Sequence, residues 1–491
     1  MLNYTLEAIC KATGGVLYGG KKDLAVNTVS TDSRGDVSGS LFIPISGDSF
    51  DGHDYIEGAI AKGAVCALTE REPQNEPYPL IKVTSTRQAL MDLAVYERSH
   101  FTGSVVAITG SAGKTTTKDM IASVVSKKYN TLKTQGNFNN DIGLPLTLLS
   151  RKRDHEVIVL EMGMNHFGEI SVLSHIGKPS ICLITNIGDA HIENLGSREG
   201  ILKAKSEIFE GMKENGTVIL NGDDPLLSTL PQVPNAGKTI YGYRRPDILD
   251  GTVTAISARS DLGDKNNSWI AATVTEYLGL KGTKCIIFWN FKAHGEKMQE
   301  GGSIQVHIPL PGDHMIMNAL MSFAVGLELE IDPGKIAEGI KEFTPSNHRM
   351  AIVEVNGMTI VNDSYNASPS SMKAAVDMMT DSLNDSAGRK VCIFGDMFEL
   401  GDHAEFLHKE VGQYIAAKEM DLLITIGPLS KYMHEAFYNS PKVLQGKALH
   451  FLTKEDFLSE WKNHLRQGDT VLIKASRGMS LEKVAEEIIK K

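Results

Sequence analysis

The most informative segment of this chain is Val105-Val106-Ala107-Ile108-Thr109-Gly110-Ser111-Ala112-Gly113-Lys114-Thr115-Thr116. Its first part, 105–109, is a nearly continuous apolar run, which predicts a buried strand. Residues 115–126 follow, and their apolar side chains share one helical face: Met120, Ile121, Val124 and Val125. Glycines between a strand and a helix let backbone N–H groups point at phosphate oxygens, and the helix dipole adds to the attraction. This unit therefore predicts a phosphate-binding loop in an α/β domain.

Two side chains of the loop have specific expected tasks. Lys114 would neutralise the β- and γ-phosphate charge of a nucleotide, and Thr115 would offer its hydroxyl to Mg²⁺. The usual spacing of such loops places a first glycine where this chain has Ile108, so the loop is a shortened variant. The alternative is an ordinary strand–helix turn that contains Gly-Lys-Thr. The flanking strand and helix favour the phosphate loop.

Candidate metal ligands follow two further apolar runs, 157–160 and 181–184, which predict parallel strands covered on both faces. Glu161 comes directly after the first run, and His191 follows the second. The carboxyl ends of parallel strands are where α/β sheets place ligand groups, and carboxylate oxygen is the usual Mg²⁺ ligand. Alternatively, Glu161 caps a loop and His191 bonds a neighbour. Either residue alone favours that alternative, but beside the phosphate loop the two together indicate a metal site.

Lys205 lies on an apolar helical face, because positions 201, 204, 205 and 208 share one side of a predicted helix. A lysine in such a place extends to water or pairs with a carboxylate. If it is buried instead, its pKa falls, and a neutral amine carries chemistry that a solvated lysine lacks. The residues alone leave these alternatives open.

Length and composition indicate a multidomain globular protein. A chain of 491 residues predicts about three domains, and 42% hydrophobic with 22% charged residues is typical of soluble chains. The net charge of −10 argues against a nucleic-acid binder. The five cysteines have no Cys-x-x-Cys spacing, which predicts free thiols. No signal-peptide pattern and no run of ~20 apolar residues is present, so we expect a cytoplasmic protein without membrane insertion.

The pattern of elements divides the chain near residues 101 and 346. The expected domains are 1–101, a mixed α/β unit, 102–346, the sheet with the phosphate loop, and 347–491, a third α/β unit. Alternating apolar and polar residues within 251–311 predict antiparallel strands. Apolar runs at 391–394, 422–426 and 471–473 predict strands of the third unit.

Several further sequence segments, together with the phosphate loop, form a set of motifs whose order and spacing along the chain are specific to one family. Besides the loop, the set comprises Thr31-Asp32-Ser33-Arg34, Asp51-Gly52-His53, Gly136-Asn137-Phe138-Asn139-Asn140, Glu161-Met162-Gly163, Thr185-Asn186-Ile187-Gly188-Asp189-Ala190-His191, Asn362-Asp363-Ser364-Tyr365-Asn366-Ala367, Gly395-Asp396-Met397-Phe398-Glu399-Leu400-Gly401 and Lys474-Ala475-Ser476-Arg477-Gly478. With these segments the chain resembles the Mur ligase family over essentially its full length. The resemblance implies three domains: an N-terminal UDP-sugar-binding domain, a central P-loop ATPase-like parallel sheet, and a C-terminal Rossmann-like domain that closes over both.

The resemblance also implies roles for the residues that match. ATP would be bound by Gly110, Ser111, Ala112, Gly113, Lys114, Thr115, Thr116, Asn318 (adenine), Arg349 (γ-phosphate) and Asp363. Mg²⁺ would be held by Thr115, Glu161, His191 and Lys205, with Lys205 as a carbamate. Catalysis would depend on Lys114, Lys205, His191 and Arg349. The UDP-sugar would meet Ser30, Asp32, Ser33, Arg34, Asn137, Asn139 and Asn140. One departure is His314-Met315, where the family often has His-Asn.

The implied reaction activates a carboxylate with ATP as an acyl phosphate and joins it to an amine. Within the family we expect a monomeric enzyme of peptidoglycan precursor synthesis that joins D-alanyl-D-alanine to UDP-N-acetylmuramoyl-tripeptide and binds no nucleic acid. The nearest alternative is a sister ligase that adds a diamino acid to the muramyl dipeptide. Such ligases carry an Asp-Asn-Pro-Arg segment, whereas this chain has Gly395-Asp396-Met397-Phe398-Glu399-Leu400. A folylpolyglutamate synthetase would lack the segment around Arg34, and a nucleotide-switch protein would not need Lys205.

Overall fold

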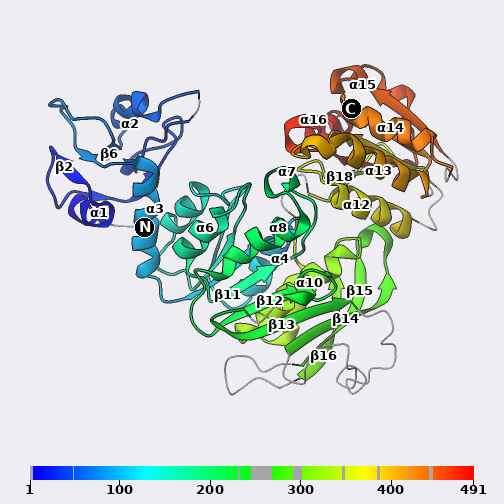
Figure 1. Cartoon of the computed structure of the whole chain (residues 1–491), viewed down its shortest axis with the longest axis horizontal. Helices are drawn as coiled ribbons and strands as arrows, with labels where there is room; N and C mark the ends of the chain where they lie inside the picture. The colour runs from blue at the N-terminus through cyan, green and yellow to red at the C-terminus, as the bar shows by residue number, and fades with distance from the viewer. Residues whose placement is uncertain are drawn as a thin grey trace.

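The computed structural model describes residues 4–490 except 48, 231–232, 245–267, 291–300, 346–348, 384–387, 419 and 442–445. Three parts follow one another along the chain, each built on its own main sheet, and we refer to them as the N-terminal, central and C-terminal parts. Figure 1 shows the N-terminal part (blue) and the C-terminal part (yellow to red) at opposite ends of the central part. The expected boundary at 346/347 and a portion of the expected antiparallel region lie outside the described residues.

The central sheet carries the phosphate loop. Among the described residues its strand order is β16-β15-β14-β13-β12-β11-β8-β10-β9, and the neighbours from β9 to β14 pair in parallel. The bounds are Ser104–Thr109 (β8), Thr131–Lys133 (β9), Val157–Glu161 (β10), Ile181–Ile184 (β11), Gly216–Asn221 (β12), Ala236–Arg244 (β13), Ser268–Tyr277 (β14), Thr283–Asn290 (β15) and Gly301–Ile308 (β16). β14, β15 and β16 pair antiparallel, as the alternating pattern predicted. The three expected buried strands are confirmed as β8, β10 and β11.

The apolar run of β8 is buried because helices cover both faces of the sheet. One face is covered by α4 (Lys114–Val125), α10 (His314–Glu328) and α11 (Pro333–Lys341), and the other by α5 (Gly143–Leu149), α6 (Glu169–Gly177) and α8 (Arg198–Ser206). Val106 and Ile108 belong to the first core, and Val105 and Ala107 belong to the second. Successive side chains of a strand point to opposite faces, so this strand needs apolar residues throughout.

The N-terminal part has a five-stranded sheet in the order β2-β7-β6-β5-β4 among the described residues. The bounds are Val16–Tyr18 (β2), Thr28–Ser30 (β4), Ser40–Phe42 (β5), Cys66–Thr69 (β6) and Leu80–Lys82 (β7). Helix α3 (Thr86–Ser99) then leads into the central part, and its Leu93 shares a hydrophobic core with Leu144 of α5. Arg98 at the end of α3 donates hydrogen bonds to the carbonyls of Gly177 (2.6 Å) and Lys178 (2.9 Å). The first two parts therefore share one continuous core.

The C-terminal part has a six-stranded sheet in the order β17-β18-β22-β19-β20-β21 among the described residues. Strand bounds are Ala351–Val355 (β17), Met358–Asn362 (β18), Lys390–Gly395 (β19), Leu422–Ile426 (β20), Lys447–Phe451 (β21) and Thr470–Lys474 (β22). Helices α12 (Pro369–Ser382), α13 (Ala404–Ala416), α14 (Ser430–Tyr438) and α16 (Glu482–Lys490) accompany it. The three strands expected here are confirmed as β19, β20 and β22. β18, β22 and β19 are parallel neighbours, so their carboxyl ends meet at one edge.

All five cysteines are free, which confirms the expectation from their spacing. Four of them are buried, and Cys10 is half-buried. In the described part of the chain, no helix combines the length and the apolar character that crossing a membrane requires.

Candidate active site

A cavity of about 1060 Å³ lies between the central and C-terminal parts. Its wall is formed by the loops after β8, β10 and β11 on the central side and by the loops after β18, β19 and β22 on the C-terminal side. The carboxyl ends of the two sheets thus face one another, which is where parallel sheets collect ligand groups. The expected site residues that line it are Ser111, Ala112, Gly113, Lys114, Thr115, Thr116, Asn137, Asn139, Asn140, Glu161, His191, Lys205, Asn318, Arg349 and Asp363.

The phosphate loop depends on two glycines. Gly110 has φ 150°, and a Cβ there would collide with Oγ1 of Thr185. Gly113 has φ 80° and is the residue before α4, in the left-handed conformation that glycine adopts without cost. Asn186 supports the loop, because its backbone carbonyl accepts from the Ser111 N–H (3.0 Å) and its Oδ1 accepts from the Ala112 N–H (2.9 Å). These two glycines and the hydrogen bonds to Asn186 fix the backbone conformation of the loop before α4.

Lys114 projects from the first turn of α4 into this loop. Its Nζ donates a 2.7 Å hydrogen bond to the carbonyl of Gly110. Loss of hydration lowers the pKa of Lys114, the nearby carboxylate of Glu161 raises it, and the charge of Arg349 lowers it further. Among the described residues, the carbonyl of Gly110 is the only hydrogen-bond partner of the Lys114 side chain. A lysine bonded only to a neutral carbonyl is well suited to an incoming phosphate.

Glu161 ends β10 deep in the cavity and is 2% exposed. Its carboxylate accepts from the hydroxyl of Thr115 (2.7 Å) and from the side-chain amide of Asn139 (3.0 Å). Nζ of Lys118 lies 3.9 Å from the same carboxylate and 3.3 Å from Asp119, and Lys118 itself is 2% exposed. The expected metal carboxylate and the expected metal hydroxyl are therefore in direct contact. Sequence reasoning missed Lys118, which is a third member of this group.

Lys205 settles the alternatives that its sequence pattern left open. It lies in the last turn of α8 and is 1% exposed, and its side chain takes part in no hydrogen bond or ion pair within the described residues. Burial lowers its pKa well below the ordinary value, and the charge of Lys114 lowers it further. Lys205 is thus a buried amine at the cavity wall, neither extended into water nor paired with a carboxylate.

His191 connects the two halves of the cavity. It has φ 63°, an unusual conformation for a residue other than glycine, at the start of the short helix α7 (Ile192–Leu195). Its Nδ1 lies 2.8 Å from a carboxylate oxygen of Glu399 in the loop after β19. The His191 partner holds the pKa of Glu399 below its usual range. His191 therefore meets a neighbour from the C-terminal part, which sequence reasoning did not anticipate.

Arg349 and Tyr365 form a stacked pair on the C-terminal wall. The guanidinium carbon of Arg349 lies 3.8 Å from the centre of the Tyr365 ring. A planar guanidinium stacked on an aromatic face has few orientations left, so its donors are directed before any ligand arrives. Arg477 lies on the same ring, at 5.5 Å from its centre.

Asp363 and Asn318 already have protein partners. Nζ of Lys474 lies 2.5 Å from the Asp363 carboxylate and also donates to the carbonyl of Asn366 (3.0 Å). Asn318 on α10 is 5% exposed, and its Oδ1 accepts from the hydroxyl of Thr117 on α4 (3.1 Å). Both residues still line the cavity, one on each side.

Comparison with known proteins agrees with this geometry. Three family descriptions match the chain: "Mur ligase family, catalytic domain" over residues 25–98, "Mur ligase middle domain" over 108–326, and "Mur ligase, glutamate ligase domain" over 348–477. The chain belongs to the Mur ligase family. It is 37% identical to UDP-N-acetylmuramoyl-tripeptide–D-alanyl-D-alanine ligase of Bacillus subtilis (strain 168), covering 100% of this chain and 99% of the relative. It is 32% identical to the ligase of the same name from Escherichia coli (strain K12), covering 99% of each.

Solved structures of Mur ligases share the whole architecture. MurF from Acinetobacter baumannii superposes with a TM-score of 0.82 at 29% identity over 100% of both chains. MurF ligase from Thermotoga maritima in complex with ADP superposes with a TM-score of 0.74 at 27% identity, covering 96% of this chain and 99% of that one. The expected three-domain α/β fold is thereby confirmed.

The residues expected to meet a UDP-sugar fall in two places in this Mur ligase. Asn137, Asn139 and Asn140 line the cavity. Ser30, Asp32, Ser33 and Arg34 lie instead in the N-terminal part, on and after β4, and are not among the cavity residues. There Arg34 binds both carboxylate oxygens of Asp32 (2.9 and 2.8 Å), which lowers the pKa of Asp32 to about 2.

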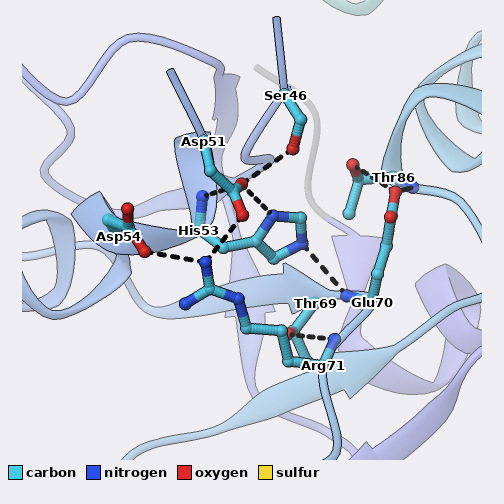
Figure 2. A network of polar contacts seen from close by, with 8 residues as sticks. All are labelled: Ser46, Asp51, His53, Asp54, Thr69, Glu70, Arg71 and Thr86. Atoms are coloured by element: carbon cyan, nitrogen blue, oxygen red, sulfur yellow. Dashed lines mark hydrogen bonds and ion pairs between the residues drawn. The ribbon is translucent and has the colours of Figure 1, made fainter. Parts of the chain in front are cut away.

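The expected motif Asp51-Gly52-His53 forms a polar network in the N-terminal part (Figure 2). The Asp51 carboxylate accepts from the backbone N–H of His53 (3.0 Å), from the Ser46 hydroxyl (2.7 Å) and from Arg71 (2.6 Å), which holds its pKa well below the usual range. Nε2 of His53 accepts from the N–H of Glu70 (3.1 Å), so Nδ1 carries the proton that faces Asp51. Through these hydrogen bonds the segment with Asp51 and His53 is bound to the loop after β6, which contains Glu70 and Arg71.

Proposed function

We propose that this Mur ligase joins D-alanyl-D-alanine to UDP-N-acetylmuramoyl-tripeptide with ATP, through an acyl phosphate, as a step of peptidoglycan precursor synthesis. Full-length relatives carry this activity in their names, and the Thermotoga maritima structure holds ADP. The observation that carries the proposal is the cavity in which the phosphate loop faces Arg349 and the loops of the C-terminal sheet.

In the first step, the terminal carboxylate of the muramyl peptide attacks the γ-phosphorus of ATP, the bond to the bridging oxygen breaks, and ADP leaves. We assign Lys114 and Arg349 to the charge on the transferred phosphoryl group, because both cations line the cavity. Stacking of Arg349 on Tyr365 fixes its direction before the substrate binds. Asn318 and Asp363 are assigned to the nucleotide.

We assign Mg²⁺ to a site formed by Thr115, Glu161, His191 and a carbamate on Lys205. The contact of Thr115 with Glu161 fits this donor set, and a buried amine whose pKa is lowered, such as that of Lys205, fits carbamate formation. Bound Mg²⁺ would neutralise phosphate charge.

In the second step, the amine of the acceptor attacks the carbonyl carbon of the acyl phosphate. The C–N bond forms, the C–O bond to phosphate breaks, and the amine gives up its proton as inorganic phosphate departs. Because the loops of both sheets line one cavity, amine and acyl phosphate are held side by side.

Further assignments complete the proposal. Ser30, Asp32, Ser33, Arg34, Asn137, Asn139 and Asn140 are assigned to the UDP-sugar substrate. We place the domain limits at 1–101, 102–346 and 347–491, and we propose a monomeric cytoplasmic enzyme.

Phosphate release tests the substrate choice. UDP-muramyl-tripeptide with D-alanyl-D-alanine should support turnover, whereas UDP-muramyl-dipeptide with lysine or diaminopimelate should not. Turnover with the diamino acid alone would assign the chain to the sister activity and leave the ligase chemistry in place.

A further inference from the structure

Three loops meet at the C-terminal edge of the cavity, after the neighbouring strands β18, β22 and β19. Ser476 joins them, because its hydroxyl accepts from the N–H of Phe398 (2.9 Å) and lies 3.5 Å from the carbonyl of Ala367. Directly after Ser476 stands Arg477, whose side chain is 58% exposed. This arginine lines the cavity, yet neither step of the proposed reaction uses it.

Arg477 and Arg349, the arginine assigned to the transferred phosphoryl group, both lie against the ring of Tyr365. The guanidinium carbons of Arg349 and Arg477 lie 3.8 and 5.5 Å from the centre of the same ring, so they are at most about 9 Å apart. Two extended residues span at most about 7 Å. A dipeptide whose amine lies beside the phosphoryl group at Arg349 therefore keeps its carboxylate within reach of Arg477.

The surroundings of Arg477 fit a small amphiphilic end group. The ring of Phe398 is 41% exposed and packs so closely over Gly478 that a Cβ there would lie 2.8 Å from it. An ion pair with Glu482 engages Nη1 of Arg477 at 3.3 Å. A guanidinium has five donors, so this pair leaves others for a ligand, and a planar fork matches a carboxylate. The guanidinium of Arg477 beside the exposed ring of Phe398 can therefore bind a carboxylate while the ring packs against a neighbouring methyl group.

We infer that Arg477 binds the C-terminal carboxylate of the acceptor dipeptide, with Phe398 against its terminal methyl group. This rests on the proposed function, which supplies an acceptor with a free amine at one end and a free carboxylate at the other. Arg477 is then a specificity-determining residue, which selects a dipeptide by the distance between amine and carboxylate.

Steady-state kinetics with D-alanyl-D-alanine and with its C-terminal amide test the inference. The wild-type KM should be about 10- to 100-fold higher for the amide, because a charge-assisted bond is lost. Arg477→Gln should raise the KM for the acid by a similar factor, leave that for the amide nearly unchanged, and hold kcat within about threefold. The KM values for ATP and the muramyl substrate should stay at wild-type levels.

Arg466→Gln is the matched control, because Arg466 is also exposed (69%) in the C-terminal part but does not line the cavity. It should keep both KM values. An unchanged KM of Arg477→Gln for the acid, or equal losses with acid and amide, would overturn the inference while the ligase function stands. Failure of the wild type to use D-alanyl-D-alanine would overturn both.

Discussion

Replacing Lys205 with methionine should abolish turnover and yet stabilise the metal-free protein. Lys205 is 1% exposed, its side chain has no hydrogen bond or ion pair in the described part of the chain, and burial lowers its pKa well below 10.5. Methionine has a similar length and carries no charge, so it removes the cost of burying the amine. It also removes the only atom that could carry the carbamate.

The pH dependence gives the magnitude. A base whose pKa is lowered in the folded state binds fewer protons there than in the unfolded state, so stability rises with pH. Between the lowered pKa and 10.5, the deficit of wild type relative to Lys205→Met should shrink by up to about 1.4 kcal/mol per pH unit. For an unfolding unit of ~200 residues this corresponds to about 3–6 °C in Tm per pH unit.

Scanning calorimetry of both proteins at pH 7, 8 and 9, in EDTA and CO₂-free buffer, measures this difference. Lys203→Met is the matched control, because Lys203 lies on the exposed face of the same helix, and it should show neither the pH effect nor loss of turnover. In ¹³C-bicarbonate, wild type and Lys203→Met should give a carbamate signal by NMR, and Lys205→Met should give none. A Tm difference that is constant with pH, or a wild type more stable than Lys205→Met at pH 7, would refute the reasoning.

Other substitutions test the loop and the contact between parts. Lys114→Ala should stop phosphate release with circular dichroism and Tm near wild type, and activity within a few-fold would contradict its assignment to the phosphates. Gly110→Ala should lower stability by about 1–3 kcal/mol and weaken ATP binding, because its Cβ meets Thr185 at φ 150°; normal Tm and affinity would contradict this. Glu399→Gln removes a charge facing His191, and because Glu399 is 59% exposed the loss should stay below about 1 kcal/mol. Small-angle scattering should then show a larger radius of gyration for the free enzyme, and an identical profile would count against the contact.

The strands and the phosphate loop could be predicted because their signals are local. The apolar run of β8 and the glycines after it specify a strand, a turn and a helix start within a dozen residues. The antiparallel end of the central sheet was predictable from alternation for the same reason. The order in which the strands pair and the core that α3 shares with α5 could not be predicted, because both depend on contacts between distant segments.

Site residues could be predicted from the sequence where the type and local position of one residue indicate its chemistry. Contacts between site residues that are distant in the sequence could not be predicted. Lys205 could be singled out from its helical face, but its burial without a partner required the fold. Lys118 stands one helical turn after Lys114, yet its relation to Glu161 joins positions far apart in sequence. The stack on Tyr365 likewise unites Arg349 and Arg477 from two separate loops, and no spacing in the sequence reveals it.

The distribution of charge between the two sheets explains why the reaction needs both. The central side supplies the phosphate loop and Glu161, whereas the C-terminal side supplies the two arginines. Helix α3 ties the N-terminal part to the central part through a shared core, and another hydrophobic core extends from Met315 of the central part to Met378 of the C-terminal part. At the cavity itself the two sides also meet through polar loop contacts, such as that of Glu399 with His191. Loop contacts of this kind cost far less to separate than a hydrophobic core. We therefore expect opening for substrate entry to begin at these polar loop contacts, on the C-terminal side of the cavity.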